Sequence, residues 1–285
     1  MPDAATNAIL RDIALLAVLA TMLGVAAYAM ARRVAPLTGW NYRGNVLTRL
    51  YDIPDAVLAV LLAVLLVQGL FTDASADPAT PLAPVGMSSE SEQLGMLISQ
   101  LFFSLLISIG LVCYLRFVRG FDPAELFGVR NLSPGKVITV ALTVIAPAMV
   151  IVGLVNAGVS DLLKDVWPDA SPQEIVKTFE TTGSLAVRLL MVVAAVVVAP
   201  LSEELLFRGF LYGVCKRYTD SHFAALINAL LFATVHMHVG SFAPLFTLAL
   251  LLVLVYEITG SLVVPMLIHA LFNGLMMIAM LAGGE

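Results

Sequence analysis

The chain has 285 residues, of which 60% are hydrophobic and only 12% are charged. A soluble globular domain carries charge on about a quarter of its residues, so this composition excludes an ordinary soluble domain. It predicts an all-α fold, that of a polytopic membrane protein with about eight transmembrane helices. The net charge of −5 is spread over loops without a basic patch, which argues against a nucleic-acid partner. The two cysteines have no metal-binding or CxxC spacing and predict no disulfide framework.

Eight stretches of the sequence are apolar over about the 20 residues that a membrane-spanning helix needs. Arg32 and Arg33 directly follow the first stretch, which favours a transmembrane helix there over a cleaved signal peptide. We expect the seventh to be the weakest, because it is short and has Pro244 near its start. The expected spans are 13–31, 55–71, 94–115, 137–159, 186–207, 222–239, 242–257 and 261–281.

The loops between these spans alternate in charge. Residues 32–54 and 116–136 carry arginine or lysine, whereas 72–93 carries only acidic charges and 160–185 is net acidic. Because basic loops remain on the cytoplasmic side, both chain termini are predicted to lie outside. We therefore expect an integral, multi-pass protein, and the compact composition favours a prokaryotic cell membrane.

Ionisable and amide side chains inside the spans collect in the last third of the chain. The first four spans contribute almost none. This asymmetry predicts two parts: residues 1–185 with about four spans as a scaffold, and residues 186–285 with about four spans as a helical core that carries the site.

The adjacent carboxylates Glu203 and Glu204 stand in an otherwise apolar span, where insertion scales put each ionised carboxylate at a penalty of at least roughly 2.5–3.5 kcal/mol. Glu204 and Arg208 are four residues apart, so they share a helix face and are predicted to form an ion pair. Glu203 points about 100° away and is predicted to face a water-filled cavity. His269 and Asn273 have the same spacing of four and project together from the last span.

His236 follows Phe232 by four residues, which places an aromatic ring one turn from the imidazole. Pro200 precedes Glu203 and Pro265 precedes His269 by three and four residues. Each proline is predicted to remove one backbone hydrogen bond and to leave a carbonyl that needs another partner. Such kinks are typical of helices that line a hydrated site, but prolines are also common in membrane helices generally, and both interpretations stay open.

This set of side chains suits amide hydrolysis inside a membrane. A glutamate in apolar surroundings is a general base for water, and a histidine can share that water and pass a proton to the leaving amine. An asparagine amide with a second histidine can donate hydrogen bonds to the oxyanion. A serine or cysteine nucleophile is not supported, since Ser202 has no evident His–Asp partner.

Three motifs occur in chain order on these spans. They read Glu203-Glu204-Leu205-Leu206-Phe207-Arg208, Phe232-Ala233-Thr234-Val235-His236 and His269-Ala270-Leu271-Phe272-Asn273. With them the chain resembles the CPBP family (CAAX proteases and bacteriocin-processing enzymes, or Abi family) of intramembrane endopeptidases, which includes the type II CAAX prenyl protease. The resemblance covers roughly residues 186–281.

The resemblance implies a role for each motif residue. Glu203 would be the general base on water, with His236 assisting it. Glu204 and Arg208 would support and orient that base, while His269 and Asn273 would form the oxyanion site. The partners implied are membrane lipids and a membrane-associated protein or peptide substrate that is either prenylated or leader-bearing.

The family is often labelled as metalloproteases, and Glu203, His236 and His269 offer three ligands to zinc. The chain has no HExxH motif, and a water activated directly by glutamate explains the same residues. We therefore expect a site without a cofactor and keep zinc as the alternative.

Two other classes of function compete with an endopeptidase. The first is a catalytically silent membrane scaffold or immunity factor, against which the intact motif set argues. The second is a proton-coupled transporter, because clusters of glutamate and histidine also relay protons. The absence of an inverted repeat argues against the transporter.

Overall fold

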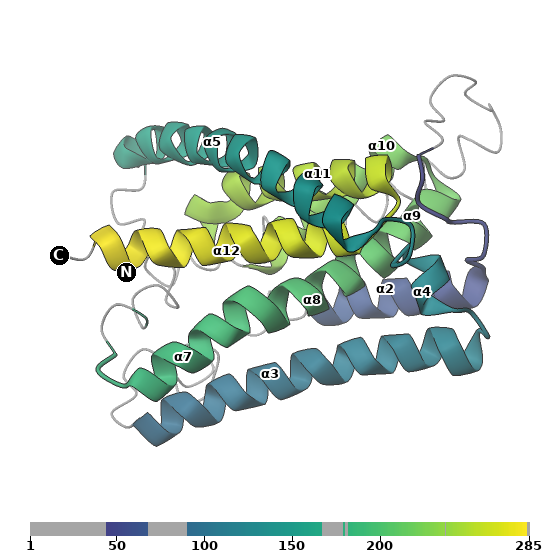
Figure 1. Ribbon diagram of the computed structural model, residues 1–285, viewed down its shortest axis with the longest axis horizontal. Helices are drawn as coiled ribbons and strands as arrows, with labels where there is room; N and C mark the ends of the chain where they lie inside the picture. Colours follow the sequence, from purple (N-terminus) through teal and green to yellow (C-terminus); the bar gives the residue numbers. More distant parts are fainter. Residues whose placement is uncertain (1–43, 68–89, 167–178, 180–181, 237, 284–285) are drawn as a thin grey trace. The chain divides into compact units, whose positions relative to one another are not determined.

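In the computed structural model, residues 44–67, 90–166, 179, 182–236 and 238–283 are described, and their regular structure is entirely helical (Figure 1). The all-α fold class is thus confirmed. Five of the described helical stretches are long and apolar enough to cross a membrane, and two shorter apolar helices accompany them. The chain is an integral, multi-pass membrane protein.

Seven of the eight expected spans coincide with helices, and the first, 13–31, lies outside the described residues. The helices before residue 167 are α2 (Ile53–Val67), α3 (Glu90–Cys113) with the π-helical η2 (Tyr114–Val118), α4 (Pro123–Leu126) and α5 (Pro134–Val166). One continuous span then comprises α7 (Leu185–Val193), η3 (Ala194–Val198), α8 (Ala199–Glu203), η4 (Glu204–Tyr212) and α9 (Gly213–Tyr218), with η3 and η4 π-helical. The last helices are α10 (Ser221–Val235), α11 (Val239–Thr259) and α12 (Val263–Gly283).

The boundary between α10 and α11 differs from the expected one. α10 ends at Val235, and α11 begins at Val239 and reaches 21 residues, with Pro244 inside it. The Nδ1 atom of His238 accepts a hydrogen bond from the backbone N–H of Ser241 at 3.0 Å, which satisfies an N–H group that the first turn of a helix leaves without a partner. The span expected to be weakest is therefore a full-length helix, because its start is capped upstream of the proline.

The described residues form two compact units, each built from segments distant in sequence. The first unit comprises the described residues within Met1–Thr80, Ile151–Ala170 and Phe210–Ile258. The second comprises the described residues within Pro81–Val150, Ser171–Gly209 and Thr259–Glu285. The division into a scaffold up to residue 185 and a core after it stays a prediction.

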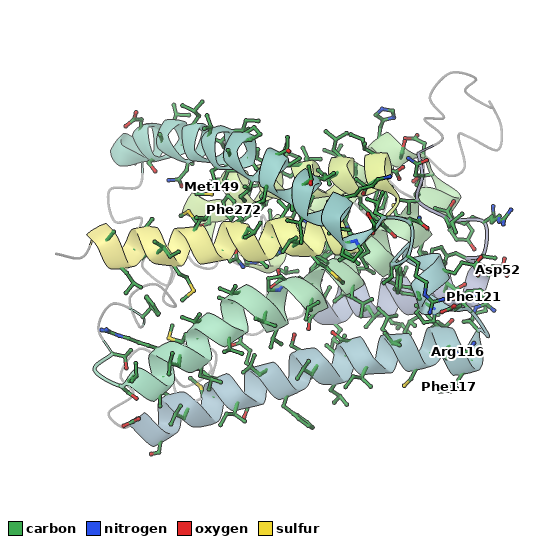
Figure 2. The ribbon with its side chains drawn as sticks, in the orientation of Figure 1. Asp52, Arg116, Phe117, Phe121, Met149 and Phe272 are labelled. Carbon is green, nitrogen blue, oxygen red and sulfur yellow. The ribbon has the colours of Figure 1, made fainter. Side chains whose placement is uncertain are left out.

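In the second unit, α3 runs beside α7 and α8, and α12 packs against η3 and α8 (Figure 1). Val187 and Met191 of α7 form a small buried core with Phe179. Apolar side chains also cover the outer face of this unit; Phe117 at the end of η2 is 79% exposed (Figure 2). An apolar exposed surface of this kind is what lipid contact requires, since the helices satisfy their own backbone groups.

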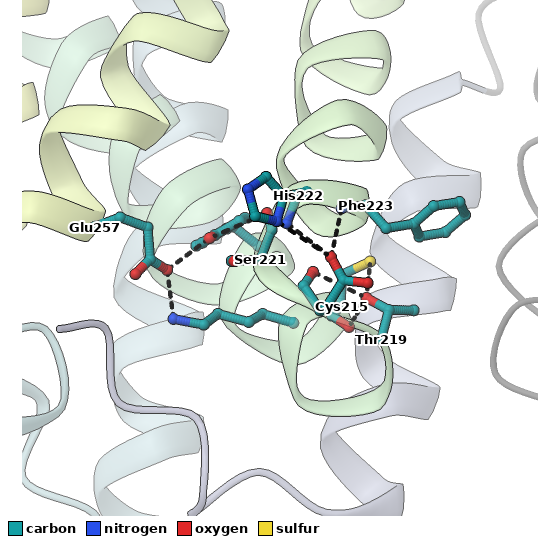
Figure 3. Close-up of polar contacts among 9 residues, drawn as sticks. Cys215, Thr219, Ser221, His222, Phe223 and Glu257 are labelled. Carbon is teal, nitrogen blue, oxygen red and sulfur yellow. Dashed lines mark hydrogen bonds and ion pairs between the residues drawn. The ribbon is translucent and has the colours of Figure 1, made fainter. Parts of the chain in front are cut away.

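In the first unit, α10 packs against α2 and α9. The buried carboxylate of Glu257 on α11 accepts hydrogen bonds from the hydroxyl of Tyr212 at 2.6 Å and the ammonium of Lys216 at 2.5 Å (Figure 3). Asp220 caps α10 by accepting from the backbone N–H groups of His222 and Phe223 (Figure 3). The charge of Glu257 is therefore buried and paired.

The start of α12 is fixed by a close approach of two backbone segments in the second unit. Gly128 and Gly260 both have φ near +62°, a conformation that favours glycine. The side-chain amide of Asn131 donates to the carbonyl of Gly260 at 2.7 Å, and the N–H of Leu262 donates to the carbonyl of Phe127 at 2.9 Å. These contacts set where α12 begins, and hence which of its residues face η3 and α8.

Replacing Gly128 with alanine should destabilise the protein strongly, because the added Cβ would overlap the carbonyl oxygen of Gly260 as well as strain the backbone. Gly120→Ala is the matched control: its φ is also positive, at 70°, but its Cβ would meet no atom within 4 Å. We expect Gly120→Ala to lower the free energy of unfolding only through backbone strain, by about 1–2 kcal/mol. The check is thermal unfolding of both variants in detergent; equal losses would contradict the close approach.

Candidate functional site

The span that carries Glu203 and Glu204 departs twice from the α-helical hydrogen-bond pattern. α8 is a short α-helical segment, with the π-helical η3 before it and the π-helical η4 after it. π-helical turns are rare and occur frequently at functional sites, because each inserts a residue and re-aims the side chains that follow. Glu203 is the last residue of α8 and Glu204 the first of η4, so the carboxylate pair lies at one of these changes.

Glu204 is the centre of a buried polar network. Its Oε1 atom lies 2.9 Å from the NH1 atom of Arg208 and 2.8 Å from the Nδ1 atom of His269 on α12. The side chains of Glu204 and Arg208 are fully buried, and that of His269 is 4% exposed. The ion pair predicted from the spacing of four residues is therefore present. Its burial means that the carboxylate is stabilised by these two partners rather than by solvent.

Glu203 lies beside the same histidine but in a different environment. Its Oε2 atom is 3.9 Å from the Nε2 atom of His269, and its side chain is 28% exposed. A carboxylate can only accept, so the 2.8 Å contact with Glu204 assigns the hydrogen of the neutral imidazole to Nδ1. The Nε2 atom of His269 is then left with a lone pair directed towards Glu203. The two glutamates contact opposite nitrogens of one ring.

Asn273 follows His269 on α12 and contacts the π-helical turn before α8. Its side-chain amide donates a hydrogen bond to the backbone carbonyl of Ala195 at 2.8 Å. The two prolines near the site have different effects. Pro200 lies inside the span, two residues after the end of η3, whereas Pro265 is only the third residue of α12, where an N–H has no partner within the helix. The expectation that Pro265 kinks its helix is wrong for this reason.

His236 belongs to the first unit. It caps the C-terminus of α10, and its Nδ1 atom lies 2.7 Å from the carbonyl of Phe232, which assigns the ring hydrogen to Nδ1. The rings of Phe232 and His236 are 4.8 Å apart between centroids, as their spacing predicts. This leaves Nε2 of His236 as the atom available for chemistry. Its approach to Glu203 stays a prediction.

A metal centre needs three or more suitable side chains in one place. Across the described part of the chain, no group of three His, Cys, Asp or Glu side chains is placed to hold a metal ion. Glu203 and His269 approach one another, and the Nδ1 atom of His269 is engaged by Glu204. Because His236, the third of the alternative ligands, belongs to the first unit, zinc stays an alternative prediction.

The second unit therefore brings together four of the six predicted site residues in one contact network: Glu203, Glu204, Arg208 and His269. Asn273 lies one turn further along α12 and contacts the carbonyl of Ala195. The catalytic roles of all six predicted residues stay predictions. The role of the Ala195 carbonyl as the acceptor for Asn273 was not predicted from the sequence. Pro200 was the available signal, because it indicates a nearby carbonyl without its usual partner.

Comparison with known proteins supports the resemblance drawn from the three motifs. Residues 185–275 match the family model for the type II CAAX prenyl endopeptidase Rce1-like proteins. A curated protein of Bacillus subtilis (strain 168), named "Putative membrane peptidase YdiL", is 27% identical over 92 residues. That match covers 32% of this chain and 38% of the relative, so the chain spans well under half of the relative's length. No solved structure matches the chain at a comparable level.

Replacing Arg208 with methionine should destabilise the protein by about 3–5 kcal/mol, because it leaves the buried charge of Glu204 without its cation. Adding Glu204→Gln should restore part of the loss, since the amide removes that charge. Arg130→Met changes an exposed arginine of the same unit and should have little effect. Thermal unfolding in detergent checks all three, and a double variant no more stable than Arg208→Met would contradict the proposed pairing.

Proposed function

We propose that the protein is an intramembrane endopeptidase, which hydrolyses a peptide bond of a membrane-associated or lipidated substrate with a water molecule activated by Glu203. The observation that carries this proposal is the difference between the two glutamates. Glu204 is buried and fixed by Arg208 and His269, whereas Glu203 is partly exposed and lies 3.9 Å from the far nitrogen of His269. A structural ion pair explains the first glutamate but not the second.

The geometry around Glu203 suits a bound water. The separation of 3.9 Å between its Oε2 atom and the Nε2 atom of His269 is too long for a direct hydrogen bond. One water molecule can contact both atoms, and at such separations a bridging water is the natural candidate. Glu203 then takes the proton of this water as it attacks the scissile carbonyl. His269 cannot rotate away, because its Nδ1–H group is held by Glu204.

Charge balance supports a proton that is shared within the site. Two carboxylates and one guanidinium carry a net charge of −1, and one additional proton on Glu203 or His269 makes the cluster neutral. Inside a membrane a neutral cluster is strongly favoured over a charged one. The proton that leaves the water can therefore be retained by the cluster and passed to the leaving amine through Nε2 of His269. His236 assisting this water is part of the same proposal.

The substrate class follows from the membrane setting and from the relatives. The matching family model is described as that of CAAX prenyl endopeptidases, and the Bacillus relative is named as a membrane peptidase. The apolar outer faces of the helices support a site that lipid-anchored chains can reach. We propose a prenylated or leader-bearing protein or peptide as the substrate, with membrane lipids as the surrounding partners.

Glu203→Gln should lower the rate of cleavage by about 10²–10⁴-fold or more, because glutamine has nearly the same shape but cannot accept the proton of water. Glu125→Gln replaces an exposed glutamate of the same unit and is the matched control. The measurement is peptidomics of cells carrying each variant, followed by cleavage of the accumulated precursor with purified protein in proteoliposomes.

Three outcomes are decisive. Uncut precursors that accumulate only with Glu203→Gln support the endopeptidase. A biological activity that survives Glu203→Gln intact indicates a silent scaffold or immunity factor. Proton or solute flux in proteoliposomes that depends on Glu203, without any cleaved peptide, indicates a transporter.

We further propose that the protein lies in a prokaryotic cell membrane with the basic loop 116–136 in the cytoplasm and both termini outside. In a variant whose two cysteines are replaced by serine, a new cysteine at Arg130 should resist an impermeant maleimide in intact cells. A new cysteine at Asp77, in the acidic loop, should be labelled. The reverse pattern would overturn the orientation.

A further inference from the structure

The carbonyl of Ala195 loses both of the backbone partners that a helix can give it. In an α-helix its donor would be the N–H of Ala199, but that group donates to the carbonyl of Ala194 instead, in the five-residue pattern of a π-helix. In the π-helical pattern the next donor in line for Ala195 is residue 200. This residue is Pro200, which has no N–H. The proline therefore creates an acceptor without a backbone donor in the middle of a membrane span.

The side chain of Asn273 supplies the missing donor. Its Nδ2 atom lies 2.8 Å from the carbonyl oxygen of Ala195, and Asn273 is itself partly buried on α12. A carbonyl without a donor is unfavourable at this depth, because no water is available to replace the missing partner. The amide of Asn273 thus completes the π-helical turn in place of the backbone.

This contact matters for Glu203 because a π-helical turn determines the direction in which the later side chains project around the helix axis. The turn inserts one residue, and its reversion to α-helix would rotate every later side chain by about 100° relative to the residues before it. Glu203 follows the turn by only five residues. A rotation of that size would remove its carboxylate from the Nε2 atom of His269.

We propose that Asn273 is a positioning residue, which holds the π-helical turn of Ala194–Val198 through the carbonyl that Pro200 leaves open and so keeps Glu203 directed at His269. The inference rests on the proposed function only for its effect on cleavage; the effect on stability stands without it. It gives the Nδ2 group of Asn273 a task away from the substrate, which differs from the oxyanion role that the family resemblance implies.

α12 is then attached to the carboxylate-bearing span at two points. His269 contacts Glu204 and Glu203, and Asn273, about 6 Å further along α12, contacts Ala195. The two contacts run in opposite chain directions on the two helices, as an antiparallel pair requires. Both must be made at once for the carboxylate and the imidazole to keep their separation.

The test is a double-variant cycle of Asn273→Leu and Pro200→Ala. Asn273→Leu alone should lower the unfolding temperature by about 2–4 °C and kcat by roughly 10²-fold with little change in KM, because the base is misdirected while the rest of the site remains. Pro200→Ala restores an N–H in line with the carbonyl of Ala195. In that background Asn273→Leu should therefore have little effect on either quantity.

Two controls separate this role from general loss of packing. Thr143→Val removes a side-chain-to-carbonyl bond of the same unit that lies within α5, to Thr139, and should leave kcat unchanged. Pro147→Ala replaces a proline inside α5 and should not rescue Asn273→Leu.

The outcomes distinguish this inference from the proposed function. Recovery of both unfolding temperature and kcat in the double variant supports the positioning role. Recovery of stability without kcat overturns it, because Asn273 would then act directly on the reaction. No recovery of stability also overturns it. If the wild-type protein cleaves nothing, the proposed function fails, and the unfolding temperatures still decide whether Asn273 completes the turn.

Discussion

The buried carboxylate of Glu204 is the interaction on which the site depends. One of its oxygens is shared by Arg208 on its own helix and His269 on α12, and none of the three side chains is appreciably exposed. A buried ion pair adds little net stability compared with apolar residues, but removing one partner is strongly unfavourable. The arrangement therefore specifies geometry: α12 can pack on this span only in the register that places the imidazole against Glu204.

Glu203 derives its properties from this fixed neighbour. Because the ring of His269 is held through one nitrogen, the other nitrogen is presented to Glu203 at a constant position. The start of α12 is set in turn by the close approach of Gly128 and Gly260, so the placement of the histidine is determined at both ends of the helix segment that carries it. A carboxylate at membrane depth needs such fixed partners, since misplaced charge is unfavourable there.

The sequence alone identified the carboxylate pair, its arginine and the histidine on α12, because spacings of four residues and the unfavourable burial of charge are visible in one chain. It also predicted seven membrane spans where the structure has helices, although the boundary between α10 and α11 lies at a different residue than expected. The missed features are of another kind. A π-helical turn depends on which backbone groups find partners, and the cap that His238 provides depends on local folding; neither follows from hydrophobic periodicity.

Pro200 shows how such a feature could be anticipated. A proline within a membrane helix requires that some carbonyl be satisfied from elsewhere, and the polar side chain that does so must come from a neighbouring helix. Asn273 projects from the same face of α12 as His269, so the residue that contacts the carboxylates and the residue that completes the turn reach the span together. A motif of histidine and asparagine four residues apart thus has two separable physical tasks. The histidine contacts the carboxylates, and the asparagine binds the backbone carbonyl of the turn that directs Glu203.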